Sequence, residues 1–420
     1  MDKHSHENND QAAGASRPTS ARSLIEWLQS DEFSEFIRAQ MQASHIPGLS
    51  LAIIDQGSLV HTAGFGLADI ALGRAMTPQT LLNIGSITKT ITCTAVMQMY
   101  EQGKLELDVS IDKYLPFTVR NPAFSDRPIT ARHLLTHTAS IADSPLFWSG
   151  YVRGDPQAAL LDWLQQYFTT AGSFFDAKRN FNAWAPGGTY QYCNVGYGLL
   201  GLLVERLSDM SYPDYCREHI FSPLGMNDAR FLMAGMPREK HATLYDYIDD
   251  GDTSKVKMID PEWSAPAGQK DMHVPHCLYS YVTLSDGLAR TTASELARFL
   301  MAYMQDGVLE GERILRAETI QKVLSDQHVQ GLRSSRQIQG LTWCQGDSYQ
   351  EDRAKPYDSA TATWWRDIWG HGGSDPGVST YMGFRPTDRR GVVLLANLGG
   401  HPPARPEIIE RIFTWTGDKR

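Results

Sequence analysis

Apolar residues alternate at strand spacing near both ends of the chain and recur at helical spacing between them. Residues 48–66 alternate on both sides of a turn at Asp55, Gln56 and Gly57, a pattern that predicts a β-hairpin. Further strands are expected late in the chain, at 338–345, 378–385 and 391–398. The two ends pair most simply in one antiparallel sheet.

The segment between these strands is mostly helical in pattern. Its most apolar helices are expected at 86–102 and 194–207. Other helices are predicted at 129–136, 157–168, 294–305 and 405–415. The stretch 21–44 is also helical in pattern, and a slip of the apolar phase near Ser30 is consistent with two short helices there. We therefore predict an α/β (α+β) fold in which helices flank an antiparallel sheet built from both chain ends, with an inserted, mostly helical lobe.

Length alone suggests two or three domains or one large composite unit. The chain has 420 residues, of which 42% are hydrophobic, enough to build a core without disulfide or metal staples. The polar residues 1–22 are expected to form a flexible tail. Because the two chain ends share one sheet, residues 23–420 are expected to form a single two-lobed unit. The sheet lobe would take about 23–85 and 330–420, and the helical lobe about 86–329.

Charge and cysteine content narrow the class of protein. There are 39 basic and 48 acidic residues, a net charge of −9, which argues against a nucleic-acid partner. The sequence lacks both a membrane-spanning apolar run and the apolar region of a secretory signal. Its five cysteines are widely spaced and form no CxxC. We expect a cytoplasmic protein without a membrane partner; the oligomeric state stays open.

The first candidate for chemistry is the pair Ser86 and Lys89, in the run GSITK at the start of a predicted helix. A spacing of three places both side chains on one helix face. A serine hydroxyl needs an adjacent base to act as a nucleophile, and a lysine kept neutral by burial can serve. Taken alone, the pattern is more typical of an N-cap serine beside a solvated lysine than of a catalytic pair.

Tyr192 and Asn194 are the second candidate, where the run PGGTYQYCN leads into a helix. Alternation places the two side chains on one face of an extended turn. A phenol can act as a base only beside cations, and an asparagine can orient a lysine or a substrate carbonyl. The structural alternatives are a packing aromatic and a helix N-cap.

The run WGHGGSDPG at 369–377 is the third candidate and contains His371, Gly373 and Ser374. Glycines in a strand often mark close approach of the backbone to a ligand. Free N–H groups at a strand edge can complete an oxyanion hole. The alternative is a glycine-rich turn with a structural histidine.

In this order and spacing, the three motifs resemble those of the serine β-lactamase and penicillin-binding-protein family, most closely its class C β-lactamase and esterase branch. The family motifs S-x-x-K, Y-x-N and K-T-G or H-x-G correspond here to runs beginning at Ser86, Tyr192 and His371. Segments similar to that branch also stand at 134–138, 221–226, 287–299 and 371–377. The resemblance covers about residues 23–416 and implies a β-lactamase/transpeptidase-like fold.

The resemblance also implies roles for the motif residues. Ser86 would be the acylated nucleophile, and Lys89 and Tyr192 would share the proton transfers, with the acylation base left open between them. Asn194 would hold Lys89 and contact the acyl side of the substrate.

On the opposite strand, His371 stands where other branches have lysine. It would line the site facing the serine and hydrogen-bond Tyr192. The backbone N–H groups of Ser86 and Ser374, next to Gly373, would form the oxyanion hole.

Several positions depart from the family pattern. Ser140 stands where a turn glycine is usual, and Cys193 stands where serine or alanine is common, most simply as a small packed thiol. The segment 244–281 matches nothing in the family and is expected to cover the cleft and set the substrate. The histidine pairs at 133/137 and 273/276 fit metal-site spacings poorly, so we expect no metal and no cofactor.

The sequence therefore predicts a serine hydrolase that acts through a Ser86 acyl-enzyme on a small-molecule acyl substrate, an ester or an amide. Carboxylesterase activity is the leading interpretation. An acyltransferase of secondary metabolism would use the same acyl-enzyme, and a β-lactamase or D-amino-acid peptidase is a further alternative. A catalytically silent binding module is the non-enzymatic hypothesis.

Overall fold

The sheet of this protein joins strands from the two ends of the chain. The computed structural model describes residues 23–332, 337–346 and 364–417. Its largest sheet has eight strands in the order β12-β13-β14-β15-β16-β1-β2-β3. Their bounds are β1 Gly48–Asp55, β2 Ser58–Asp69, β3 Arg74–Ala75, β12 Ile338–Gln339, β13 Cys344–Gln345, β14 Trp369–Asp375, β15 Val378–Arg385 and β16 Arg390–Ala396. All pairings are antiparallel, and β1 pairs with β16 from Leu49↔Ala396 to Ile54↔Gly391. The predicted fold class is thus confirmed.

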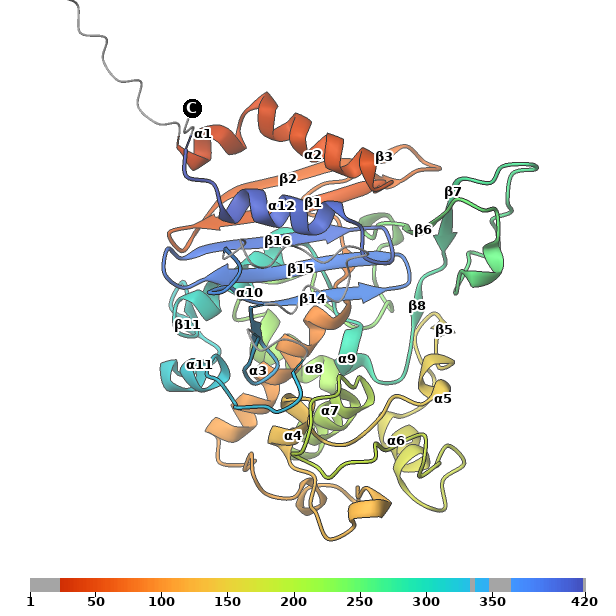
Figure 1. The fold of residues 1–420 in the computed structure, drawn as a ribbon, viewed down its shortest axis with the longest axis vertical. Helices are drawn as coiled ribbons and strands as arrows, with labels where there is room; N and C mark the ends of the chain where they lie inside the picture. Colours follow the sequence, from red (N-terminus) through yellow and green to blue (C-terminus); the bar gives the residue numbers. More distant parts are fainter. Residues whose placement is uncertain (1–22, 333–336, 347–363, 418–420) are drawn as a thin grey trace, which may run out of the picture.

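Both faces of the sheet are buried, which is why its central strands read as nearly continuous apolar runs. In β1, Leu49, Leu51 and Ile53 point into one cluster of buried residues, whereas Ala52 and Ile54 point into the other. The first cluster lies under α1 (Leu24–Leu28), α2 (Asp31–Ala43) and α12 (Ala404–Phe413) (Figure 1). On the other face α10 (Ala293–Met304) packs on β1 and β16.

The remaining helices lie below β14 in the view of Figure 1. They are α3 Thr88–Glu101, α4 Ala131–Leu135, α5 Pro145–Trp148, α6 Leu160–Phe168, α7 Val195–Ser208, α8 Tyr212–Cys216, α9 Leu284–Gly287 and α11 Ala317–Val323. Helix α3 is buried from Thr88 through Met99 and packs against α7 and α9. It therefore forms the centre of the helical region and carries its first turn to the edge of the sheet.

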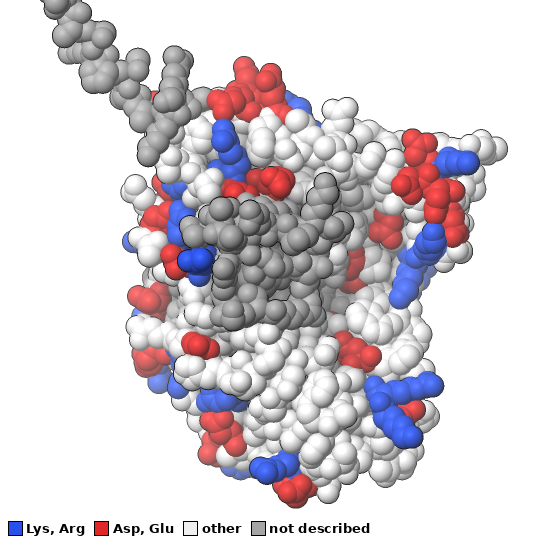
Figure 2. All heavy atoms as spheres, viewed as in Figure 1, with Lys and Arg blue, Asp and Glu red and all other residues white. Residues whose placement is uncertain are grey.

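Short two-stranded ladders complete the fold. They pair β4 (Leu82–Asn83) with β9 (Arg290–Thr291), β5 (Val152–Arg153) with β8 (Tyr279–Ser280), β6 (Leu244–Ile248) with β7 (Met272–His276), and β10 (Val308–Leu309) with β11 (Glu312–Arg313). On the described part of the face in Figure 2, Lys and Arg are interspersed with Asp and Glu.

Several predicted elements differ in detail from the structure. The strand expected at 338–345 is two short strands, β12 and β13, because the chain turns between them with Thr342 at φ +72°. The glycine-rich run at 369–377 contains a full strand, β14. The helical stretch expected at 21–44 is divided into two helices at the phase slip near Ser30, where the Ser30 side chain caps the second helix by accepting a hydrogen bond from the Phe33 N–H.

Within the described ranges, no helix is both long enough and apolar enough to cross a bilayer. The cytoplasmic location stays a prediction, as do the lobe boundaries near residues 86 and 330. The tail expected at 1–22 lies outside the described residues.

Candidate active site

Ser86 lies in η1 (Gly85–Ile87), a single 3-10 turn that leads into α3 and touches the sheet. Gly85 has φ +53°, and a Cβ there would come within 2.9 Å of the Ser374 backbone nitrogen. The Thr380 hydroxyl donates to the Ile84 carbonyl at 2.8 Å. The turn is therefore fixed against β14 and β15, and this approach requires glycine at position 85.

Lys89 follows one turn later and its side chain is fully buried. Its Nζ lies 3.1 Å from Ser86 Oγ, 2.7 Å from Asn194 Oδ1 and 2.6 Å from the Asp286 carbonyl oxygen. Burial lowers the pKa of Lys89 from its ordinary value of 10.5 to about 8, although nearby carboxylates such as Asp286 and Asp143 oppose the shift.

These three contacts dictate how a neutral lysine would be oriented. A neutral amine has two N–H groups and one lone pair. Asn194 Oδ1 and the Asp286 carbonyl can only accept, so each takes one N–H of Lys89. The lone pair is then left facing the Ser86 hydroxyl, which is the geometry of a general base.

Tyr192 borders the same hydroxyl from the loop before α7. The centroid of its ring is 4.9 Å from Lys89 Nζ. The ring also stacks on the His137 ring, with 4.3 Å between the two centroids. Burial raises the pKa of Tyr192 well above 10, against the effect of its hydrogen bond with Ser86. The phenol therefore stays protonated at neutral pH and is suited to relaying a proton.

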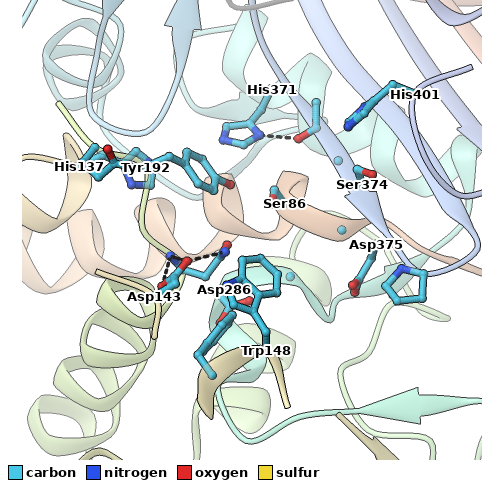
Figure 3. A pocket seen from close by; sticks show the side chains of 18 of the residues that line it. Ser86, His137, Asp143, Trp148, Tyr192, Asp286, His371, Ser374, Asp375 and His401 are labelled. Atoms are coloured by element: carbon cyan, nitrogen blue, oxygen red, sulfur yellow. Dashed lines mark hydrogen bonds between the residues drawn. The ribbon is translucent and has the colours of Figure 1, made fainter. Parts of the chain in front are cut away.

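His371, on β14, lines the opposite side of the cleft in Figure 3. Its Nδ1 lies 2.6 Å from the carbonyl oxygen of the adjacent Gly372, and the hydrogen bond expected between His371 and Tyr192 stays a prediction. Burial lowers the pKa of His371 to about 4, with the Lys89 charge adding to the effect. The imidazole is neutral at pH 7 and cannot supply the positive charge that lysine gives at this position in other branches.

Gly373 and Ser374 follow His371 along β14, at the edge that faces η1. A Cβ on Gly373 would lie 2.1 Å from the Ile84 carbonyl oxygen, so only glycine fits this position without displacing the backbone. Ser374 is exposed in the cleft, and its hydroxyl is 3.4 Å from the Gly400 carbonyl oxygen. The predicted site residues thus lie around one cleft, which is lined by Ser86, Tyr192, Asn194, His371, Gly373 and Ser374. Lys89 is buried beside Ser86 and does not line the cleft.

The cleft has a volume of about 780 Å³. Figure 3 shows Tyr192 and Trp148 on different sides of Ser86, and His371 across from Asp286. Segment 244–281, expected to cover the cleft, contributes Asp246, Lys257 and Tyr281 to its lining.

The sequence analysis missed three carboxylates at the site. Asp143 accepts hydrogen bonds from the start of α7. The Asp286 carboxylate accepts hydrogen bonds from the hydroxyl groups of Tyr281 and Thr283. The Asp375 carboxylate accepts one from the Tyr151 hydroxyl at 2.5 Å. Burial raises the pKa of Asp286 and of Asp375 to about 7. Asp375 lies inside the segment 371–377 and Asp286 directly precedes the segment 287–299, both of which resemble the family, and this was the one signal that pointed to them.

The departures from the family pattern have structural explanations. Ser140 adopts φ +61° where glycine is usual, and its side chain accepts from Asn121 Nδ2 at 2.7 Å and donates to the Trp184 carbonyl. The Cys193 thiol is buried, which raises its pKa well above 9, so it is not a poised nucleophile.

The histidine pairs are engaged with the backbone. His273 Nε2 lies 2.6 Å from the His45 carbonyl oxygen, and His276 Nδ1 lies 2.7 Å from that of Lys257. His137 accepts the Cys193 N–H. In the described parts of the chain, no three His, Cys, Asp or Glu side chains are grouped so as to hold a metal ion.

Comparison with known proteins agrees with this geometry. The sequence model of the family "Beta-lactamase" matches residues 33–413. Penicillin-binding protein 4 of Amycolatopsis lactamdurans is 29% identical over 358 residues, 84% of this chain and 82% of that protein. Protein flp of Staphylococcus aureus is 26% identical over 239 residues, 56% of this chain, and the match spans only 45% of that protein. A structure titled "A class C beta-lactamase" has the same fold, with a TM-score of 0.68 and 20% identity over 94% of this chain and 98% of that one.

Proposed function

Because the chain belongs to the beta-lactamase family, a family of serine hydrolases, we propose that it cleaves carboxylic esters through an acyl-enzyme on Ser86. The observation that carries the proposal is the Lys89 amine, buried and tied to two acceptors so that its lone pair faces Ser86 Oγ at 3.1 Å. A weak hydroxyl nucleophile needs such a base.

In acylation, Ser86 Oγ attacks the ester carbonyl carbon while its proton passes to Lys89. The backbone N–H groups of Ser86 and Ser374 stabilise the oxyanion. The carbon–oxygen bond to the alcohol then breaks, and the leaving oxygen takes a proton from Lys89, directly or through Tyr192. Water next attacks the acyl carbon, gives its proton to the same base, and Ser86 leaves with a proton restored.

Lys89 is the better candidate than Tyr192 for the acylation base. Its pKa of about 8 keeps a useful fraction of neutral amine at neutral pH. Burial pushes the pKa of Tyr192 in the wrong direction for a base. Tyr192 then serves as a proton relay.

The neutral His371 favours an uncharged ester over a carboxylate-bearing β-lactam. With its pKa lowered to about 4, its imidazole offers no cation to a substrate carboxylate. The stretch that contributes Trp148 to the cleft lining also exposes other apolar side chains. Leu146, Trp148 and Val152 are 46%, 44% and 40% exposed within one short stretch, and Trp148 lines the cleft. Apolar side chains exposed together beside a cleft suit a substrate with an apolar acyl group.

The test is a pre-steady-state assay with p-nitrophenyl acetate and butyrate. Wild-type protein is expected to release a burst of p-nitrophenol equal to the concentration of sites, and Ser86→Ala is expected to release none. A wild-type rate in Ser86→Ala would rule out the mechanism. Nitrocefin turnover faster than that of the esters would instead favour a β-lactamase.

A further inference from the structure

Asp143 lies in the loop before α5 and accepts several hydrogen bonds from the start of α7. Its carboxylate oxygens accept the backbone N–H of Asn194 at 2.9 Å and that of Val195 at 2.9 Å. Oδ2 also accepts the Asn194 side-chain amide at 2.8 Å. Asn194, the N-cap residue of α7, makes no side-chain cap hydrogen bond of its own. Asp143 therefore caps this helix from a distant loop.

The bond to the side chain fixes which way the Asn194 amide points. A carboxylate can only accept, so the amide must turn its Nδ2 towards Asp143. Its Oδ1 is then directed at Lys89 Nζ, 2.7 Å away. In the reverse orientation the amide would present N–H groups to the N–H groups of Lys89, and one of the two acceptors that orient the amine would be lost.

We propose that Asp143 is a positioning residue of this site, which sets the Asn194 amide and through it aims the Lys89 lone pair at Ser86 Oγ. The inference rests on the proposed function, since it concerns the base that activates Ser86.

The pKa of Lys89 reports on this arrangement because charged and titratable groups approach the amine from several elements. They are Asp143, Cys193, Asp286, Asp375, Tyr192, His137 and His371. Asp143 raises the pKa of Lys89 and so opposes the effect of burial. Removing its charge should lower that pKa further.

The experiment compares D143N, N194D and the double variant D143N/N194D, with D155N as a matched control. Asp155 likewise accepts backbone N–H groups, from Met233 and Ala234, but does not line the cleft. The readout is the rate of Ser86 acylation by p-nitrophenyl butyrate as a function of pH.

In D143N the new amide can accept the backbone N–H groups of α7 with its oxygen, but its NH2 group then faces the NH2 group of Asn194. Because two donors cannot form a hydrogen bond, the Asn194 amide is expected to flip. Misplacing a reacting group by roughly 1 Å costs about 100-fold in rate, and we expect a loss of this order in the high-pH plateau. In the double variant, Asn at 143 donates to Asp at 194, whose free oxygen again accepts from Lys89. Its plateau should exceed that of each single variant by about tenfold.

The midpoint of the pH dependence should move in opposite directions in D143N and in the double variant D143N/N194D. Activity rises with pH as Lys89 loses its proton. The midpoint should fall below the wild-type value in D143N, which loses a negative charge. It should rise above the wild-type value in D143N/N194D, where the charge touches the amine. These two shifts follow from the charges alone and show that Lys89 is the titrating group, whereas recovery of the plateau in the double variant is the result that a helix cap alone would not produce.

Loss of folded protein cannot explain a higher plateau in D143N/N194D than in N194D. D143N weakens the cap of α7, yet adding it to N194D is predicted to increase the rate. A D143N variant with the wild-type plateau and midpoint would overturn the inference, as would a double variant no faster than N194D. If wild-type protein gave no acyl-enzyme at all, the proposed function itself would fail, and D155N should match wild type in either case.

Discussion

The rate of Ser86 acylation should rise with pH through a midpoint near 8. Lys89 must be neutral to take the serine proton, and its pKa is lowered to about 8 because it is buried. Below that pH the amine is protonated and has no lone pair for Ser86. The expected profile is therefore a single ascending limb followed by a plateau.

The size of the effect follows from the shift of the Lys89 pKa from 10.5 to about 8. Since one pKa unit corresponds to about 1.36 kcal/mol, the shift amounts to about 3.4 kcal/mol. At pH 7 an ordinary lysine is neutral in about one molecule in 3000, whereas a pKa of 8 gives about one in ten. Burial thus increases the fraction of usable base by about 300-fold.

The assay is stopped-flow release of p-nitrophenol from p-nitrophenyl butyrate between pH 5 and 10, with hydroxide hydrolysis subtracted by using Ser86→Ala. Lys89→Arg is the control, since its guanidinium stays charged and the limb should disappear together with most of the rate. The pKa of His371 is about 4, so a histidine base would give a limb far below that of Lys89. A midpoint below pH 6, or no dependence between pH 6 and 9, would refute the assignment of Lys89 as the base.

Other predictions concern stability and specificity. The folded-state pKa of Lys89 is lowered, so the unfolded chain binds more protons between pH 8 and 10.5, and the Lys89 contribution to unfolding free energy rises across this window. Lys89→Met should remove about 3 kcal/mol of that rise, and urea titrations in which the unfolding free energy changes equally between pH 8 and 10.5 in both proteins would contradict this. Gly373→Ala should cost about 1–3 kcal/mol, because its Cβ would meet the Ile84 carbonyl oxygen at 2.1 Å; an unchanged Tm and burst rate would be inconsistent with that contact. Trp148→Ala should reduce the preference for p-nitrophenyl hexanoate over butyrate by up to about tenfold in kcat/KM, since each buried CH2 is worth about 0.8 kcal/mol; equal selectivity in both proteins would exclude Trp148 from the acyl site.

Local periodicity was sufficient to predict most of the elements that build the fold. The alternation at 48–66 predicted the hairpin of β1 and β2, and apolar runs at 378–385 and 391–398 predicted β15 and β16. Pairing of the two chain ends followed from the order of strands and helices, and the β1–β16 register confirms it. The split of 338–345 was not predictable in this way, since it depends on a turn that packs against other parts of the chain.

The candidate site was predictable where its residues lie in short motifs. Ser86 and Lys89 are three residues apart, so helical spacing alone places them together. Asp143 is different, because it meets Asn194 across 51 residues of chain and belongs to no motif. The carbonyl of Asp286 is likewise invisible to residue type, since any residue could provide it. Contacts made by backbone groups, or across long separations, needed the structure.

The central claim is that Ser86 carries the acyl group, and intact-protein mass spectrometry during turnover tests it most directly. Protein quenched in acid after mixing with p-nitrophenyl butyrate should gain the mass of one butyryl group, and peptide mapping should place that group on Ser86. The adduct should be missing in Ser86→Ala. An unmodified wild-type protein that still releases p-nitrophenol in a burst, or a butyryl group on any other residue, would contradict the account.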